Sequence, residues 1–188
     1  IRFQELWKRL KISNDSFIRT TDPGHKEIVQ SVLQDLYDRD LIYKSEYKGF
    51  YDVRSERFFT RKDLLDGNRS PESGEVCQEI VESNYFFRMS QYQEWLIDYI
   101  EKNPEFIMPS HRRNETLGFL RQPLGDLCIS RPKERLNWGI DLPFDNDYVC
   151  YVWFDALLNY VTGIGYGTDE KEFKKWWPAS YHLIGKDI

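Results

Sequence analysis

The fold is decided by one stretch, Tyr148-Val149-Cys150-Tyr151-Val152-Trp153-Phe154-Asp155-Ala156-Leu157-Leu158-Asn159-Tyr160. Its first residues form an unbroken apolar and aromatic run, which is typical of a strand buried on both faces of a parallel sheet. The composition changes near Asp155, because Ala and Leu favour a helix and an acidic side chain suits its first turn. The stretch therefore predicts a strand that leads directly into a helix.

On this helix four side chains share one face, since they lie at positions i, i+3, i+4 and i+7: Trp153, Ala156, Leu157 and Tyr160. Open α/β folds bind their ligands at the carboxyl ends of the strands, which is where this face would lie. The small alanine between two large aromatic residues would leave a slot with apolar walls. An ordinary helix packed on a sheet has the same periodicity, so the pattern alone leaves both interpretations open.

Length and composition narrow the class of protein. A chain of 188 residues can form one large domain or two small ones, and its 16% aromatic content can fill a core with few residues. The net charge of −5 predicts a soluble protein without general affinity for nucleic acid, so any RNA contact should be a local patch. Three widely spaced cysteines fit a reducing compartment. We expect no membrane partner, because no apolar run is long enough to span a bilayer and no signal or transit pattern opens the chain.

The remaining elements are expected from periodicity and turn residues. His25 lies near the start of a predicted helix, where we expect a surface or capping residue. Ser90 is expected to cap a later helix. Helices are predicted over residues 1–12, 25–39, 92–100 and after 110, and strands over residues 17–21, 41–43, 46–51, 56–60, 84–88 and 181–185.

The predicted strand at the carboxyl end is followed by polar residues. A buried strand that ends at Gly185 would let a ligand approach the backbone. Asp187, just beyond it, could accept hydrogen bonds from the hydroxyls of a ribose. A plain turn explains the same residues equally well.

Arginine residues provide two further candidate sites. Arg131, before Pro132, could hold a carboxylate or phosphate through its planar guanidinium, although a surface ion pair would need the same residue. Arg112 and Arg113 open a predicted helix and could contact a phosphate backbone or simply face solvent.

Two residue pairs have the spacing of a zinc knuckle but not its ligands. Asp52 and Ser55 form the first pair, and Ser70 and Ser73 form the second, with a turn-rich loop between them. Structural zinc requires thiolate or imidazole donors, and neutral serine hydroxyls are poor ligands. Cys77 alone could not hold the ion. We therefore predict no zinc and no other metal site.

Together these segments resemble the methionyl-tRNA synthetases, which are class I aminoacyl-tRNA synthetases. The resemblance covers essentially the whole chain, and its strength lies in the number of motifs and their order. They are Phe17-Ile18-Arg19-Thr20-Thr21 with His25, Tyr47-x-Gly49-x-Tyr51, Asn84-Tyr85-Phe86-Phe87-Arg88-Met89-Ser90, Asn103-Pro104, Phe106-Ile107, Arg113-Asn114-Glu115, Ile129-Ser130-Arg131-Pro132, Trp138-Gly139-Ile140, Tyr151 to Tyr160, and His182-Leu183-Ile184-Gly185-Lys186-Asp187-Ile188.

The resemblance implies an α/β fold, part of a Rossmann-type catalytic core interrupted by an α+β connective-peptide insert. Residues 1–40 would be the end of the first Rossmann half, residues 41–146 the insert, and residues 147–188 the start of the second half. It also implies a reaction in which methionine and ATP, with Mg²⁺, give methionyl-adenylate and the methionyl group passes to tRNA(Met). The family relies on orientation and charge stabilisation, without a covalent protein intermediate.

The family's site residues carry over to matching positions. The match implies that Arg131 acts near the polar end of the substrate and the adenylate, and that Gly185 and Asp187 bind the nucleotide. Contacts with tRNA are expected at Arg88, Arg112 and Arg113. Many members carry Cys or His at the four knuckle positions, and this departure reinforces the expectation that zinc is absent. The methionine pocket is expected to comprise Trp153, Ala156, Leu157, Tyr160 and Ile188.

The family's His-Ile-Gly-His and Lys-Met-Ser-Lys-Ser motifs should lie before residue 1 and after residue 188. We therefore expect a central fragment that is inactive alone, from a protein of the cytoplasm or of an organellar matrix. A stand-alone module that binds RNA or a protein partner through the insert is the alternative. Another class I synthetase with an aliphatic substrate is disfavoured, since the insert is too short for an editing domain.

Overall fold

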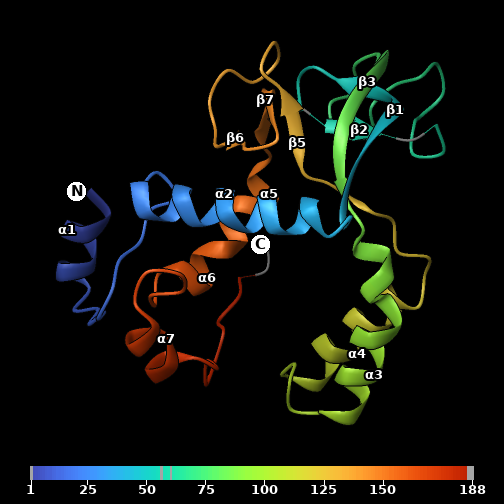
Figure 1. The fold of residues 1–188 in the computed structure, drawn as a ribbon. Helices are drawn as coiled ribbons and strands as arrows, with labels where there is room; N and C mark the ends of the chain where they lie inside the picture. The colour runs from blue at the N-terminus through green and yellow to red at the C-terminus, as the bar shows by residue number, and fades with distance from the viewer. Residues whose placement is uncertain (1, 56, 60, 186–188) are drawn as a thin grey trace. The chain divides into compact units, whose positions relative to one another are not determined.

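The structure, a computed structural model, describes residues 2–55, 57–59 and 61–185 (Figure 1). The chain divides into two compact units. One unit is discontinuous and consists of residues 1–35 and 138–188, whereas the other is the continuous segment 36–137. Helices and strands are both present in the described residues, which confirms the expected α/β composition.

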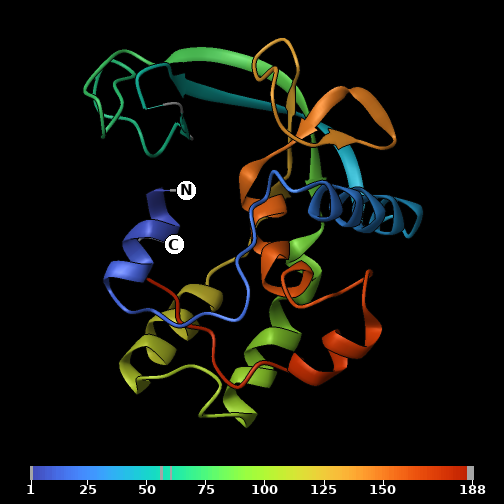
Figure 2. The ribbon, with the colours of Figure 1, turned by 90° about the vertical axis from the view of Figure 1, so that its left-hand side faces the viewer.

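The continuous unit is built on an antiparallel sheet with the strand order β2-β1-β3-β4. Strand β1 (Ile42–Asp52) and β3 (Gln78–Phe87) form its long central pair, and Figure 2 shows them running side by side. The two strands predicted over residues 41–51 are therefore one, because the ladder to β3 is unbroken from Ile42 to Tyr51. The edge strands β2 (Arg57–Phe59) and β4 (Leu127–Cys128) are short.

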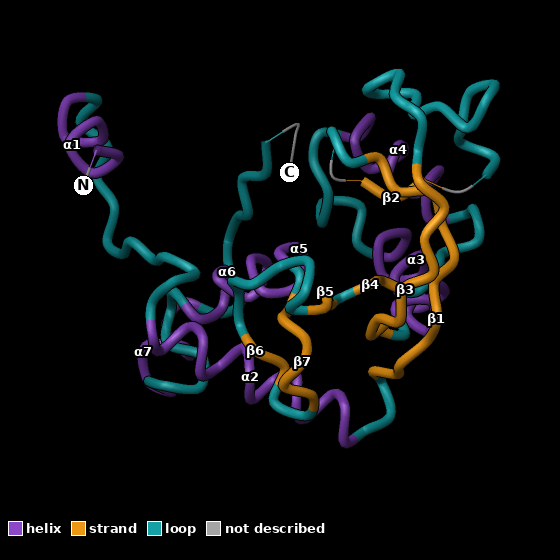
Figure 3. Tube along the Cα trace, turned by 90° about the horizontal axis from the view of Figure 1, so that it is seen from above, coloured by secondary structure: helices purple, strands orange, loops and turns teal. Residues whose placement is uncertain are grey.

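Residues 61–77, which precede β3, form a long loop, drawn in teal in Figure 3. Its base is apolar, because Phe50, Phe59 and Cys77 form a buried cluster against which Leu64 packs. Near the other end of β3, the amide of Tyr85 donates a hydrogen bond of 2.8 Å to the hydroxyl of Ser130, in β5 (Ser130–Pro132).

Two helices complete this unit. A 3₁₀ turn, η1 (Met89–Tyr92), leads into α3 (Gln93–Lys102), which packs against α4 (Ser110–Leu120) around three buried residues, Ile100, Leu117 and Leu120. The prediction that Ser90 caps α3 is wrong. Its hydroxyl donates instead to the carboxylate of Asp126 at 2.6 Å, since the 3₁₀ turn separates it from the helix end.

The discontinuous unit contains α1 (Arg2–Arg9), α2 (Pro23–Asp38) up to residue 35, and a hairpin of β6 (Asp141–Leu142) and β7 (Asp145–Cys150). It continues through α5 (Val152–Asp155), η2 (Ala156–Leu158), α6 (Asn159–Thr162) and α7 (Glu170–Trp176). Strand β7 pairs with β6 in the antiparallel sense, so the expectation of a parallel arrangement is wrong for this pair.

Two predicted strands are wrong. Residues 17–21 and 181–185 are not in strands, and Leu183 is 93% exposed. A strand needs a neighbour that accepts its backbone hydrogen bonds, and none of the described strands pairs with either run. Among the described residues, no helix has both the length and the apolar character needed to cross a membrane.

Candidate functional site

The expected strand-to-helix junction is confirmed. Tyr148, Val149 and Cys150 are buried at the end of β7, and Tyr151 keeps an extended backbone (φ −82°, ψ 142°) before the helix begins at Val152. From there α5, η2 and α6 follow without a break to Thr162. We call residues 152–162 the pocket helix, because it carries four of the five residues expected to bind methionine.

The winding of the pocket helix brings those four residues to one side. Seven residues separate Trp153 from Tyr160, which is close to two α-helical turns. Seven α-helical steps would leave the two directions about 20° apart, and the three 3₁₀ residues increase the difference to about 40°, so both rings still point to the same side. Trp153 and Leu157 are 47% and 52% exposed, whereas Ala156 and Tyr160 are half-buried. The described residues thus leave much of this apolar face uncovered.

One aromatic neighbour of this face was not expected as a site residue. The ring of Tyr160 meets the ring of His182 edge to face, with 5.1 Å between centroids, and His182 also contacts Trp177 at 6.1 Å. His182 opens the run that leads to Gly185, so these contacts connect the pocket helix to the predicted nucleotide segment. The family motif included His182, but sequence spacing gave no sign that it touches Tyr160.

The first turn of the pocket helix contains an acidic group with an unusual environment. Burial raises the pKa of Asp155 to about 6, although the backbone of Ala156 acts in the opposite direction. Burial and then the charge of Asp155 raise the pKa of the Cys150 thiol, so this buried cysteine stays protonated and is a poor nucleophile. Because the pKa of Asp155 is raised, its ionisation destabilises the folded protein as pH rises from about 4 to 6.

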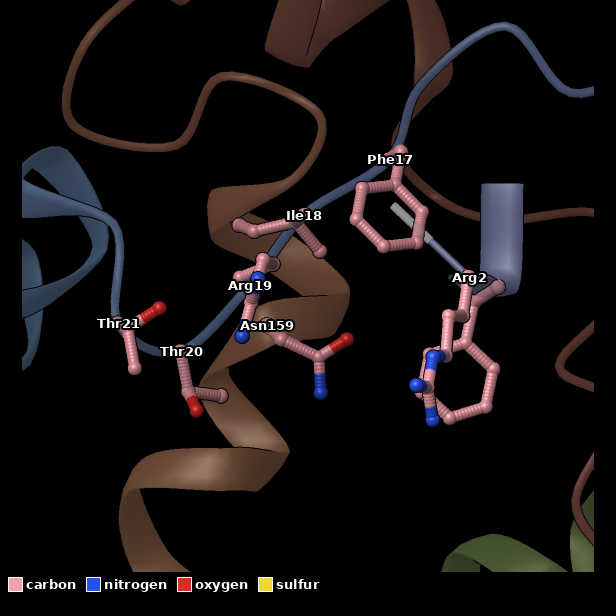
Figure 4. A pocket seen from close by; sticks show the side chains of 8 residues that line it. Arg2, Phe17, Ile18, Arg19, Thr20, Thr21 and Asn159 are labelled. Carbon is pink, nitrogen blue, oxygen red and sulfur yellow. The ribbon is translucent and has the colours of Figure 1, made fainter. Parts of the chain in front are cut away.

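A hollow of about 590 Å³ lies against the same helix. Figure 4 shows the segment from Phe17 to Thr21 along one side, Asn159 of the pocket helix beside it, and Arg2 across the opening. Of the expected methionine residues, the four that the structure describes do not line this hollow.

The other expected ligand-binding residues belong to the continuous unit, end the described residues or lie outside them. Arg131 belongs to the continuous unit, where its guanidinium donates to the carbonyl of Ser130 at 2.7 Å and to the sulfur of Cys128 at 3.1 Å. Gly185 is exposed at the end of the described residues. Asp187 and Ile188 lie outside them.

The three arginines expected to contact tRNA all make internal contacts. Arg88 stacks on the ring of Tyr43, 4.4 Å from its centroid, and donates to the carbonyl of Asp40 at 2.8 Å. Arg112 pairs with Glu115 at 2.7 Å, and Arg113 donates to the carbonyl of Pro104 at 3.0 Å. Each guanidinium therefore also serves the local structure.

The knuckle positions are joined by hydrogen bonds. Asp52 is only 1% exposed, and its carboxylate accepts from the Ser55 hydroxyl at 2.7 Å and the Arg54 amide at 2.9 Å. The hydroxyls of Ser70 and Ser73 donate to it as well. Burial alone would raise the pKa of Asp52, but these donors outweigh it and hold the pKa well below its usual range. We call these four side chains, Asp52, Ser55, Ser70 and Ser73, the Asp52 cluster.

The Asp52 cluster does not fit a zinc ion. One carboxylate and three neutral hydroxyls lack the thiolate or imidazole donors that zinc requires, and the carboxylate already accepts several hydrogen bonds. Within the described part of the chain, no group of three or more His, Cys, Asp or Glu residues is arranged to hold a metal.

Comparison with known proteins gives one consistent family. The sequence profile of the family described as "tRNA synthetases class I (M)" matches residues 1–69 and 62–188. The methionine–tRNA ligase of Clostridium tetani is 50% identical over 187 residues, and that of Caldanaerobacter subterraneus is 48% identical over 186 residues. In both cases the match covers 98% of this chain and 29% of the relative.

Solved structures agree with the sequence comparison. Mycobacterium tuberculosis methionyl-tRNA synthetase in complex with methionyl-adenylate superposes with a TM-score of 0.85 at 43% identity. The match covers 99% of this chain and 37% of that one. The chain thus spans about three tenths of the curated relatives that it matches.

Proposed function

This chain belongs to the class I (M) family of tRNA synthetases, and we propose that it is a central segment of an enzyme that activates methionine with ATP and transfers it to tRNA(Met). The observation that carries the proposal is the match of the whole chain to methionine–tRNA ligases at up to 50% identity. The uncovered aromatic face of the pocket helix gives it a physical basis. A stand-alone RNA- or protein-binding module would not require the match to methionine–tRNA ligases along the whole chain.

Methionine suits a pocket of this composition. Its thioether gains from aromatic ring edges, by about 0.3–1.5 kcal/mol for each contact. Trp153 and Tyr160 supply the rings, Ala156 and Leu157 supply apolar surface between them, and Ile188 completes the pocket. Because Ala156 has only a methyl group, the unbranched side chain of methionine fits between the two rings.

The remaining site residues handle the polar end of the substrate and the nucleotide. Gly185 allows close approach to the backbone, and Asp187 accepts hydrogen bonds from the ribose hydroxyls. Arg131 stabilises negative charge near the adenylate. Arg88, Arg112 and Arg113 contact tRNA(Met).

The reaction needs no covalent intermediate on the protein. A methionine carboxylate oxygen attacks the α-phosphorus of Mg²⁺-bound ATP, and pyrophosphate leaves. A terminal ribose hydroxyl of tRNA then attacks the carbonyl carbon, and AMP leaves. The protein contributes orientation and charge stabilisation.

The two compact units support a domain assignment. Residues 41–146 form the connective-peptide insert, and residues 1–40 and 147–188 belong to the two Rossmann halves that flank it. The contiguous unit of residues 36–137 is what an insert would form, and the discontinuous unit is what the interrupted core would leave. The insert binds no zinc, and the full-length protein acts in the cytoplasm or, in an organelle, in the matrix.

Amino-acid-dependent exchange of pyrophosphate into ATP tests the activity. The full-length protein should catalyse exchange with methionine and not with leucine, isoleucine or valine. The polypeptide of residues 1–188 alone should be inactive. Exchange that depends on an aliphatic amino acid instead of methionine would refute the assignment.

A further inference from the structure

We propose that His25 is a positioning residue for methionine binding, acting through Thr162 to fix the end of the pocket helix. The inference rests on the proposed function, since it assigns a role to a residue behind that pocket. His25 lies near the start of α2, far in sequence from the residues it would position. The structure brings His25 and Thr162 into hydrogen-bond contact within one compact unit.

The link is a partly buried hydrogen bond. Nδ1 of His25 lies 2.8 Å from the hydroxyl of Thr162, across 137 residues of sequence. The imidazole is only 2% exposed, so the expectation of a surface or capping residue is wrong. Thr162 is the last residue of α6, two positions after Tyr160. A shift of Thr162 would therefore move the phenol ring of the pocket.

The segment around His25 holds this end of the pocket helix at other points. The Ser16 hydroxyl donates to the carbonyl of Gly163 at 3.2 Å. A Cβ at Gly163 would lie 3.3 Å from Cγ2 of Ile18, so the glycine permits this close approach. A Cβ added at Gly167 would overlap Cδ1 of Ile28, so this glycine permits a close approach as well. Apolar packing is not directional, so these contacts alone would let the end of the pocket helix shift along the segment around His25. The hydrogen bond between His25 and Thr162 fixes its position.

The polar character of the imidazole favours a positioning role for His25 over one of simply filling space in the core. Burial lowers the pKa of His25, against the opposing effects of the Asp155 backbone and the charge of Asp22, so the ring is neutral near pH 7. The ring also interacts with the backbone of Asp155, which lies in the first turn of the pocket helix. An apolar side chain could fill the same space but could make neither polar contact with that helix.

Four variants of the full-length protein test the role: His25→Ala, His25→Asn, Thr162→Val and, as a matched control in α4, Thr116→Val. Kinetics of pyrophosphate exchange give KM for methionine and for ATP separately. Loss of the hydrogen bond in His25→Ala or Thr162→Val should raise the methionine KM about threefold to tenfold, because one such bond contributes that much. The ATP KM should change less than about twofold. His25→Asn should restore the methionine KM, because its amide nitrogen replaces Nδ1. Thr116→Val should match the unmutated protein.

A purely structural role predicts a different result. A lower fraction of folded protein would reduce kcat and leave both KM values unchanged. Any one of three results would overturn the proposal. The first is a reduced kcat with both KM values unchanged, and the second is an equal rise in both KM values. The third is a methionine KM for His25→Asn that is no lower than that for His25→Ala. If His25→Ala fails to fold, Thr162→Val still tests the proposal, because it removes the other partner of the same hydrogen bond.

Hydrogen exchange separates this proposal from the proposed function. Amides of residues 159–163 should exchange faster in Thr162→Val than in the unmutated protein, and unchanged exchange would overturn the inference. If the unmutated protein shows no methionine-dependent activity, the proposed function fails, and the exchange of these amides still decides whether His25 fixes the helix.

Discussion

Asp52 shows how one carboxylate can organise a loop. Donors from both knuckle pairs converge on it, so the two ends of a turn-rich loop are joined through a single buried anion. The Ser70 hydroxyl accepts from the amides of Glu72 and Ser73, which leaves its proton free for the carboxylate. An anion surrounded by hydroxyl donors thus occupies the place where a zinc site would need the opposite arrangement, a cation surrounded by anionic or imidazole ligands.

The Asp52 cluster should make the protein sensitive to acid. A carboxylate with a depressed pKa stabilises the folded state above its unfolded pKa of about 4 and loses that effect as pH falls further. Asp52→Asn should lower the urea midpoint at pH 7, because an amide cannot accept from every donor. The difference from the unmutated protein should shrink below about pH 4. Urea unfolding at several pH values measures this.

Asp66→Asn, at an exposed position in the same loop, is the control and should change neither the midpoint nor its pH dependence. Equal midpoints for Asp52→Asn and the unmutated protein at pH 7 would show that the cluster contributes no net stability.

Trp153 is the residue on which the methionine pocket depends most. Trp153→Ala in the full-length protein should raise the methionine KM about tenfold, because a ring contact with the thioether and apolar contact area are lost together. Trp176→Ala is a matched control, since Trp176 has similar exposure, 44% against 47%, on a different helix. An unchanged methionine KM for Trp153→Ala would remove this residue from the pocket.

At the residue scale, sequence patterns predict those features of a side chain that depend only on residues nearby in the sequence. The shared face of Trp153 and Tyr160 follows from helical period and does not need the rest of the fold. The burial of His25 and the contact between His182 and Tyr160 depend on partners that no local window contains. That is why His25 was expected on the surface.

The helices and strands show the same distinction between features set by nearby residues and features set by distant partners. Helices over 23–38, 93–102 and 110–120 were predicted from their apolar period, with boundaries shifted by a few residues. The runs 17–21 and 181–185 have strand-forming composition but no paired strand among the described residues. Composition favours a strand only where a neighbour completes the ladder.

Two glycines should respond to alanine in opposite directions. Gly165 has a φ of +98°, and an added Cβ would lie 2.8 Å from the carbonyl oxygen of Asp169, so Gly165→Ala should destabilise the start of α7 by about 1–3 kcal/mol. Gly118 lies inside α4 with open space around it, so Gly118→Ala should stabilise that helix by about 0.5–1 kcal/mol. Hydrogen exchange of the amides in α7 and α4 measures both. Equal effects of the two changes would contradict these assignments.

For the whole molecule, the division into two units has a consequence for folding. The segment 36–137 is continuous and has its own sheet and helix pair, so it should unfold cooperatively when expressed alone. Denaturant unfolding followed by far-UV circular dichroism and by tryptophan fluorescence should give coincident transitions. A gradual, probe-dependent transition would show that residues outside the segment are needed for its fold.

The central claim is that the pocket helix holds the side chain of methionine between two aromatic rings. A crystal structure of the full-length protein with a stable methionyl-adenylate analogue tests it most directly. The predicted result is a methylthio group within about 4 Å of both the indole of Trp153 and the ring of Tyr160. A bound analogue whose methylthio group touches neither ring would contradict the account.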